Sequence, residues 1–286
     1  MKRVLTAAVL IPVVLVLVFL GPKWQWLFTL AAAVVSMLAG LEYLGLAQRS
    51  GANPPRVAAM AALLVLFAVN FEWPEDTAAI IGILGLGLLV YCAFSRAIDG
   101  MMTDAAVSIF CLLYTGVLLI ALPTLHAQPN GASLVMFLLM VIWFGDTAAY
   151  YVGRAWGRHK LAPSLSPGKS WEGAVGSVLG SLLAAGGLLE LAALEQRSDF
   201  LSTVLQRWGV APLTYPDEFW YWLALAVLVN VAGQVGDLAE SALKRSVNVK
   251  DSGSLLPGHG GVLDRIDALL VAAPVMWYAQ VMHQRF

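Results

Sequence analysis

Nine long apolar stretches restrict this chain of 286 residues to folds that can sit in a lipid bilayer. Each is close to the roughly 17–25 residues that a helix needs to cross a hydrocarbon core about 30 Å thick. Because 59% of the residues are hydrophobic and only 12% are charged, a water-soluble globule would lack polar surface. The sequence predicts an all-α, polytopic integral membrane protein with about nine transmembrane helices, over residues 4–20, 24–47, 57–72, 77–94, 105–125, 132–152, 173–194, 219–243 and 266–283.

Several alternative classes are excluded by the same patterns. Residues 13–20 and 80–90 are continuously apolar, whereas transmembrane β-strands alternate between apolar and polar positions. Cys92 and Cys111 both lie in apolar stretches, so we expect neither a disulfide nor a zinc site. No small-residue cleavage motif directly follows the first stretch, which we expect to be a retained helix. A net charge of −1 shows no basic excess for nucleic acid, and none is expected as a partner.

The basic residues are distributed unevenly between the two sides that nine spans define. Thirteen of the 17 lysines and arginines fall on the side of the N-terminus, and the exceptions are Lys23, Arg197, Arg207 and Arg285. Loops rich in Lys and Arg stay in the cytoplasm. We therefore expect a cytoplasmic N-terminus. Many of these cations concentrate in two long polar loops, 153–172 and 244–265. Both loops fall in the C-terminal part of the chain, so we expect N-terminal transmembrane helices over residues 1–131 and a C-terminal catalytic region over residues 132–286.

Carboxylates inside apolar spans are costly, and each is a candidate for a functional site. Glu42 and Glu190 lie near span ends, where the side chain can reach the membrane interface, and a structural role is the simpler reading. Asp146 and the pair Asp237/Glu240 come just before the two basic loops. On a helix, four polar residues share one face, because they are spaced i, i+3, i+4 and i+7: Asp237, Glu240, Ser241 and Lys244.

The second loop indicates a metal and a phosphate site. Asp264 and Asp267 stand i and i+3 at the start of the last span, so with Asp237 they predict a cluster of three carboxylates. Oxygen ligands favour Mg²⁺ over zinc, and a second cation is an open alternative. We expect basic side chains and the backbone N–H groups of glycines to bind phosphate oxygens, namely those of Lys244, Arg245, Lys250, Arg265, Gly258, Gly260 and Gly261. This set is typical of phosphoryl or nucleotidyl transfer.

The first loop offers similar chemistry for an anionic substrate. Its candidates, together with two acidic residues at the edges of the loops, are Asp146, Arg158, Lys160, Ser166, Lys169, Ser170 and Asp251. The segment Gly168-Lys169-Ser170 fails the Walker A pattern, because Pro163 stands where a glycine is required and no strand is expected before it. Glu172 has an alternative role as a charge at a helix N-terminus. The small-residue run 176–180 allows close helix packing, within one subunit or between two.

The C-terminal half resembles the phosphatidate cytidylyltransferase family, the CDP-diacylglycerol synthases. The resemblance rests on SALKR at residues 241–245, KDSG at 250–253 and LPGHGGVLDRID at 256–267, and on SPGKSWEG at 166–173. It covers roughly residues 143–173 and 233–267. The first 140 or so residues are similar only in being membrane-spanning.

The resemblance implies a homodimeric enzyme of the bacterial inner membrane with an active site open to the cytoplasm. It implies condensation of CTP with phosphatidate to CDP-diacylglycerol and pyrophosphate in the presence of Mg²⁺. The family's metal-binding aspartates fall on Asp237, Asp264 and Asp267. His259 is then expected to donate to the leaving pyrophosphate or to order the glycine turn. An ion-coupled transporter and a CTP-using lipid kinase remain the alternative functions.

Overall fold

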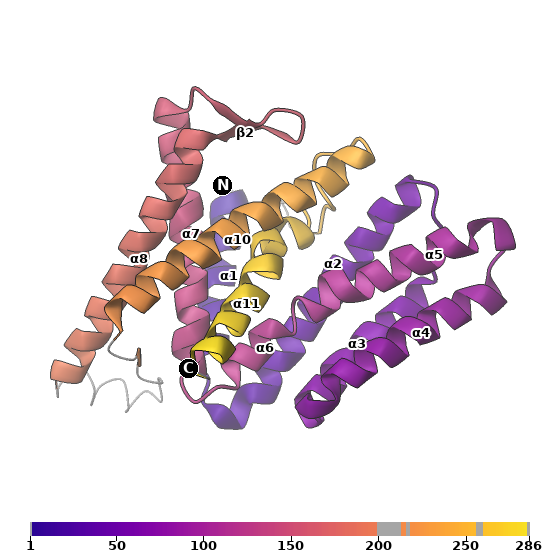
Figure 1. The fold of residues 1–286 in the computed structure, drawn as a ribbon, viewed down its shortest axis with the longest axis horizontal. Helices are drawn as coiled ribbons and strands as arrows, with labels where there is room; N and C mark the ends of the chain where they lie inside the picture. Colours follow the sequence, from indigo (N-terminus) through magenta and orange to yellow (C-terminus); the bar gives the residue numbers. More distant parts are fainter. Residues whose placement is uncertain (1, 199–212, 216–217, 256–259, 285–286) are drawn as a thin grey trace.

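A computed structural model describes residues 2–198, 213–215, 218–255 and 260–284, and the chain in this range is a bundle of helices (Figure 1). The N-terminal helices are α1 (Lys2–Phe19), α2 (Gln25–Arg49), α3 (Arg56–Glu72), α4 (Thr77–Ser95), α5 (Ile98–Cys111) and α6 (Ala121–His126). The C-terminal helices are α7 (Gly131–Trp156), α8 (Trp171–Arg197), α10 (Phe219–Ser246) and α11 (Leu263–His283). Short helical turns, η1 (Pro22–Trp24) and η2 (Pro74–Asp76), precede α2 and α4.

The predicted all-α membrane fold is confirmed, and each of the nine predicted spans corresponds to a helical unit of the described chain. Seven of these units are long and apolar enough to cross a membrane. The remaining two are α3, with 17 residues, and α1, whose described apolar part is Ala8–Phe19. The fifth unit runs from α5 through the π-helical segment η3 (Leu112–Val117) into α6.

Two hydrophobic cores share the last helix. The first core joins α7, α8 and α10 with α1 and α6, and the second joins α2, α3 and η3. Helix α11 contributes Ala272 and Met276 to the first core and Leu263 and Leu270 to the second. Helix α4 lies at the periphery, with 11% of its apolar window buried, as expected for a lipid-facing helix (Figure 1).

Small residues bring α7 and α8 into close contact. A Cβ atom at Gly180 would lie 2.8 Å from the carbonyl oxygen of Phe144, and one at Gly176 would lie 2.7 Å from Val152. The small-residue run at 176–180 therefore packs helices within one subunit. Beside it, the amide of the buried Asn230 on α10 donates to Ser177 (2.9 Å) and Ser181 (2.7 Å).

The first polar loop is not irregular throughout. Strands β1 (Lys160–Ala162) and β2 (Ser166–Ser170) form an antiparallel hairpin between α7 and α8. The expectation that no strand precedes residues 168–170 was therefore wrong. In Figure 1 the hairpin lies at the same end of the bundle as the start of α1, and α11 ends at the opposite end. This placement agrees with an odd number of spans.

Candidate active site

The two polar segments meet through an ion pair between the hairpin and α10. The ammonium group of Lys169 on β2 lies 2.6 Å from Oδ2 of Asp237. Oδ1 of Asp237 accepts a hydrogen bond of 3.5 Å from Ser241, one turn along the helix. Both ion-pair partners keep solvent access, with side-chain exposures of 24% for Lys169 and 39% for Asp237. The pair is therefore open to a ligand on one side.

Three aspartates from three helices gather at this point. Asp146 on α7, Asp237 on α10 and Asp267 on α11 lie close enough to repel one another electrostatically. Lys169 and Arg265 supply the opposite charge near Asp146. We call Asp146, Asp237 and Asp267 the acidic triad. Its membership differs from the predicted cluster, because Asp146 joins Asp237 and Asp267 where Asp264 was expected.

The acidic triad has free oxygen ligands. Asp267 accepts only from the backbone N–H of Ala268 on its own helix (2.8 Å), and Asp146 accepts from no described donor. Carboxylates that repel one another, two of which keep at least one oxygen without a described donor, suit a hard cation such as Mg²⁺. Among the described residues, no group of three or more His, Cys, Asp or Glu side chains is placed to hold a metal ion. Mg²⁺ commonly takes one or two protein carboxylates and fills its shell with water and substrate phosphate, so two aspartates of the triad would suffice for this ion.

Asp264 is held by protein donors instead. Its Oδ2 accepts from the backbone N–H of Ser252 (3.0 Å), the hydroxyl of Ser252 (3.0 Å) and the backbone N–H of Gly261 (2.8 Å). Its Oδ1 accepts from Lys244 at 2.6 Å. The side chain is 5% exposed. We call the loop between α10 and α11, residues 247–262, the signature loop. Asp264 ties this loop to α10 and α11.

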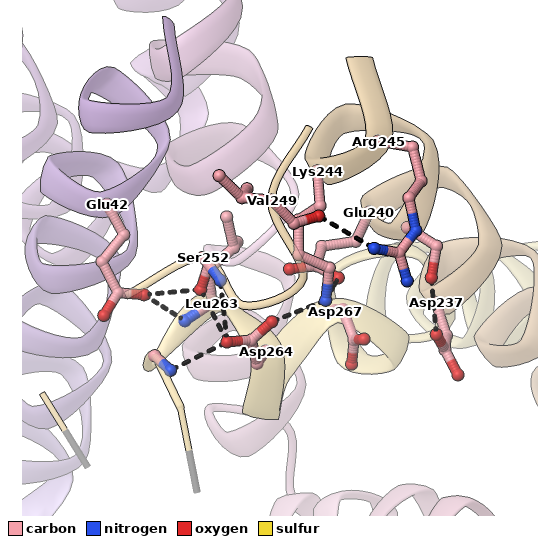
Figure 2. A network of polar contacts seen from close by, with 12 residues as sticks. Glu42, Asp237, Glu240, Lys244, Arg245, Val249, Ser252, Leu263, Asp264 and Asp267 are labelled. Atoms are coloured by element: carbon pink, nitrogen blue, oxygen red, sulfur yellow. Dashed lines mark hydrogen bonds and ion pairs between the residues drawn. The ribbon is translucent and has the colours of Figure 1, made fainter. Parts of the chain in front are cut away.

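Lys244 lies between two buried carboxylates. It pairs with Asp264 and with Glu240, which stands one turn before it on α10 and is fully buried. The lysine side chain is 12% exposed. Figure 2 shows the ammonium group directed at Asp264 and away from Asp237. Lys244 thus neutralises buried negative charge, and Lys169 and Arg265 are cations near the acidic triad.

Sequence reasoning missed the role of Glu42. This side chain of α2 is 7% exposed and accepts from the backbone N–H groups of Val262 (3.0 Å) and Leu263 (2.8 Å). It also accepts from the hydroxyl of Ser252 at 3.1 Å. The carboxylate caps the N-terminus of α11 from the opposite end of the chain (Figure 2). The one sequence feature that pointed to Glu42 was its position inside an apolar span. Glu190 has the same feature but is exposed, so this feature alone does not identify a buried contact.

The glycines of the signature loop make room for these carboxylates. Gly260 has φ = +83°, and a Cβ there would lie 2.7 Å from Oδ2 of Asp264. A Cβ at Gly261 would collide with Ser252 and Glu42, and one at Gly253 would collide with Glu42. The close approach predicted at Gly260 and Gly261 is therefore an approach of protein carboxylates to backbone, and Gly258 lies outside the described residues.

The other predicted residues divide into bound and open groups. Arg245 donates to the carbonyl oxygens of Leu165 (3.1 Å) and Val249 (3.0 Å), and so joins the hairpin to the signature loop. Ser170 is buried and caps α8, accepting from Gly173 at 3.2 Å, while Glu172 accepts from His159 Nδ1 at 2.7 Å. His259 lies outside the described residues. The exposed residues are Asp146, Arg158, Lys160, Lys250, Asp251 and Arg265, and Ser166 is half-buried.

Comparison with known proteins gives this geometry a family. A profile of the cytidylyltransferase family matches residues 1–283. The chain is similar to a phosphatidate cytidylyltransferase of Brucella suis, with 42% identity over 167 residues, which are 58% of this chain and 54% of the relative. The match thus spans about half of that relative's length.

Two further relatives carry the same name. The protein of Bacillus subtilis is 34% identical over 201 residues, which are 70% of this chain and 65% of the relative. That of Staphylococcus haemolyticus is 29% identical over 282 residues, 96% of each chain. On the strength of the profile match across nearly all of its length, the chain belongs to the cytidylyltransferase family.

Proposed function

We propose that this protein is a Mg²⁺-dependent phosphatidate cytidylyltransferase, which converts CTP and phosphatidate to CDP-diacylglycerol and pyrophosphate. The observation that carries the proposal is the acidic triad, assembled from three helices beside Lys169 at one end of a membrane bundle. Family membership and the names of the relatives support the choice of CTP as nucleotide and phosphatidate as lipid.

The reaction joins a phosphate oxygen of phosphatidate to the α-phosphorus of CTP and breaks the phosphoanhydride bond between the α- and β-phosphates, so that the β- and γ-phosphates leave together as pyrophosphate. A phosphate nucleophile is already anionic, so the protein needs to supply orientation and charge balance rather than a strong base. Asp237 and Asp267 would hold Mg²⁺, and Asp146 would complete or orient that shell. The ion would neutralise negative charge on the phosphates of CTP.

Cations around the acidic triad complete the charge balance. Lys169, 2.6 Å from Asp237, is placed to donate to a phosphate oxygen of a bound substrate. Arg265 acts electrostatically on Asp146 and is exposed. Further contacts for the nucleotide or the lipid phosphate are proposed at the exposed Arg158, Lys160, Lys250 and Asp251 and at the half-buried Ser166. Lys244, Arg245 and Asp264 hold the signature loop in place.

The location proposed for this reaction is the cytoplasmic side of the bacterial inner membrane. The excess of Lys and Arg on the side of the N-terminus supports this orientation. The hairpin lies at the end of the bundle where α1 begins (Figure 1). We also propose a homodimer, as the family resemblance implies.

Product analysis tests the proposal against its two rivals. A cytidylyltransferase moves the α-phosphate of CTP into the lipid and releases pyrophosphate, whereas a CTP-using lipid kinase releases CDP. An ion-coupled transporter consumes no CTP. The assay uses purified protein with α-labelled CTP and phosphatidate, in Mg²⁺ or in EDTA. Label in the lipid only with Mg²⁺ supports the proposal, and label in soluble CDP overturns it.

A further inference from the structure

Among the described hydrogen bonds, Glu42 is the one carboxylate of the N-terminal helices that binds the signature loop. All three of its partners are donors: two backbone N–H groups and one hydroxyl. They approach both carboxylate oxygens, since Oε1 accepts from Val262 and Oε2 accepts from Leu263 and Ser252. A negative charge here also stabilises the positive N-terminal end of the α11 dipole.

The contact fixes the turn from which the reactive side chains emerge. Glu42 binds the N–H groups of residues 262 and 263, and Asp264 binds that of Gly261 from the other side. Arg265 and Asp267 follow in the first turn of the same helix. A shift of this first turn would therefore move a carboxylate of the acidic triad and its neighbouring cation together.

The side chain of Glu42 is tightly packed. The carboxylate is 7% exposed, and the three heavy atoms nearest to a Cβ placed on Gly253 all belong to Glu42. A Cβ on Gly261 would also meet Glu42. Both glycines therefore keep the loop close against the carboxylate.

We infer that Glu42 is a positioning residue for the reaction, one that sets the orientation of the first turn of α11 and thereby the placement of Asp267 and Arg265. This inference rests on the proposed function for its catalytic consequence and on the contacts alone for its structural one. Glu42 itself lies on α2 and acts through backbone, without touching substrate.

The test replaces Glu42 with Gln, which preserves volume and leaves a single acceptor oxygen against donors on both sides. Glu190→Gln is the matched control, because it removes an exposed carboxylate from another span. We expect Glu42→Gln to lower kcat about tenfold or more, since small misplacements of reacting groups cost up to about 100-fold in rate. KM for CTP should stay within about threefold of the starting protein. Equal kcat in Glu42→Gln and Glu190→Gln would overturn the inference.

A second readout does not depend on activity. Hydrogen exchange at the amides of Val262 and Leu263 should become faster in Glu42→Gln and stay unchanged in Glu190→Gln, because those amides lose an acceptor. Unchanged exchange would overturn the inference. A wild-type protein that forms no CDP-lipid would reject the proposed function, while the exchange result would still decide whether Glu42 holds α11.

A double-mutant cycle separates positioning from a general packing defect. Gly253→Ala alone should reduce turnover, because the new methyl group displaces Glu42. Combined with Glu42→Ala, which removes the three heavy atoms nearest to that methyl group, it should cause no further loss. Losses that multiply in the double variant would contradict a shared mechanism.

Discussion

The ammonium group of Lys169 lies 2.6 Å from Oδ2 of Asp237 and joins two polar segments that lie far apart in the sequence. One partner comes from the hairpin between α7 and α8, and the other from the last turns of α10. The ion pair places a cation at the edge of the acidic triad, where a substrate phosphate would bring further negative charge. It therefore makes Lys169 the strongest candidate for a direct phosphate contact.

Replacing Lys169 by Gln should reduce turnover by about 100-fold or more, the typical effect of losing one donor to developing charge. The fold should remain intact, because both partners of the pair are partly solvent-exposed. Steady-state kinetics with labelled CTP measures the effect. Arg49→Gln, at the end of α2 and outside the site, serves as the control and should retain normal turnover.

Asp264 and Asp267 should respond differently to replacement by Asn. Asp267 repels Asp237 and Asp146, so Asp267→Asn should abolish Mg²⁺-dependent turnover and leave thermal stability unchanged or raised. Asp264 accepts four hydrogen bonds, including one from Lys244, so Asp264→Asn should lower both turnover and stability. Melting curves in detergent, recorded with activity, compare the two variants. An unchanged melting temperature in Asp264→Asn would show that its role at the loop is misassigned.

Lys244→Met should destabilise the protein by about 3–5 kcal/mol, because it leaves the carboxylates of Glu240 and Asp264 without their buried counter-charge. Adding Glu240→Gln should recover part of that stability, since one of the two unpaired charges is then removed. Asp264 keeps its three other donors in both variants. Thermal unfolding of the single and double variants gives the comparison. Equal stability of the two variants would argue against the buried charge cluster of Glu240, Lys244 and Asp264.

Gly145→Ala should destabilise the bundle by about 1–3 kcal/mol through overpacking. The added methyl group would lie 2.7 Å from Oγ of Ser181 and would collide with Asn230 at the junction of α7, α8 and α10. Gly186→Ala is the matched control, because nothing lies within 4 Å of a Cβ at that position. Helix propensity alone should make the control neutral or slightly more stable. Similar melting temperatures for the two variants would contradict the packing described here.

The membrane architecture could be predicted from the sequence because the length and continuity of apolar stretches are set by the bilayer. Eight of the nine predicted spans both begin and end within four residues of the observed helices. The exception is the fifth, which begins at Ile98 rather than 105, since Asp104 makes its first turns look polar. The structure buries Asp104 and provides a donor, the backbone N–H of Asn53 at 2.6 Å. A tertiary contact of this kind leaves no local pattern.

The candidate site could be predicted in composition and only partly in arrangement. Helical spacing correctly places Asp237, Ser241, Glu240 and Lys244 on one side of α10, where they pair within one turn. Residue spacing could not distinguish Asp264 from Asp267. In the structure, protein donors bind both oxygens of Asp264, whereas Asp267 accepts one described hydrogen bond, from the backbone N–H of Ala268. The position of Glu42 against α11 depends on how two distant helices pack, which a single sequence does not reveal.

The most direct test of the account is the fate of the α-phosphate of CTP on the purified protein with phosphatidate. We predict that label enters the lipid as CDP-diacylglycerol, that pyrophosphate is released in equal amount, and that EDTA stops both while added Mg²⁺ restores them. Label recovered only as soluble CDP, or no Mg²⁺-dependent consumption of CTP, would contradict it.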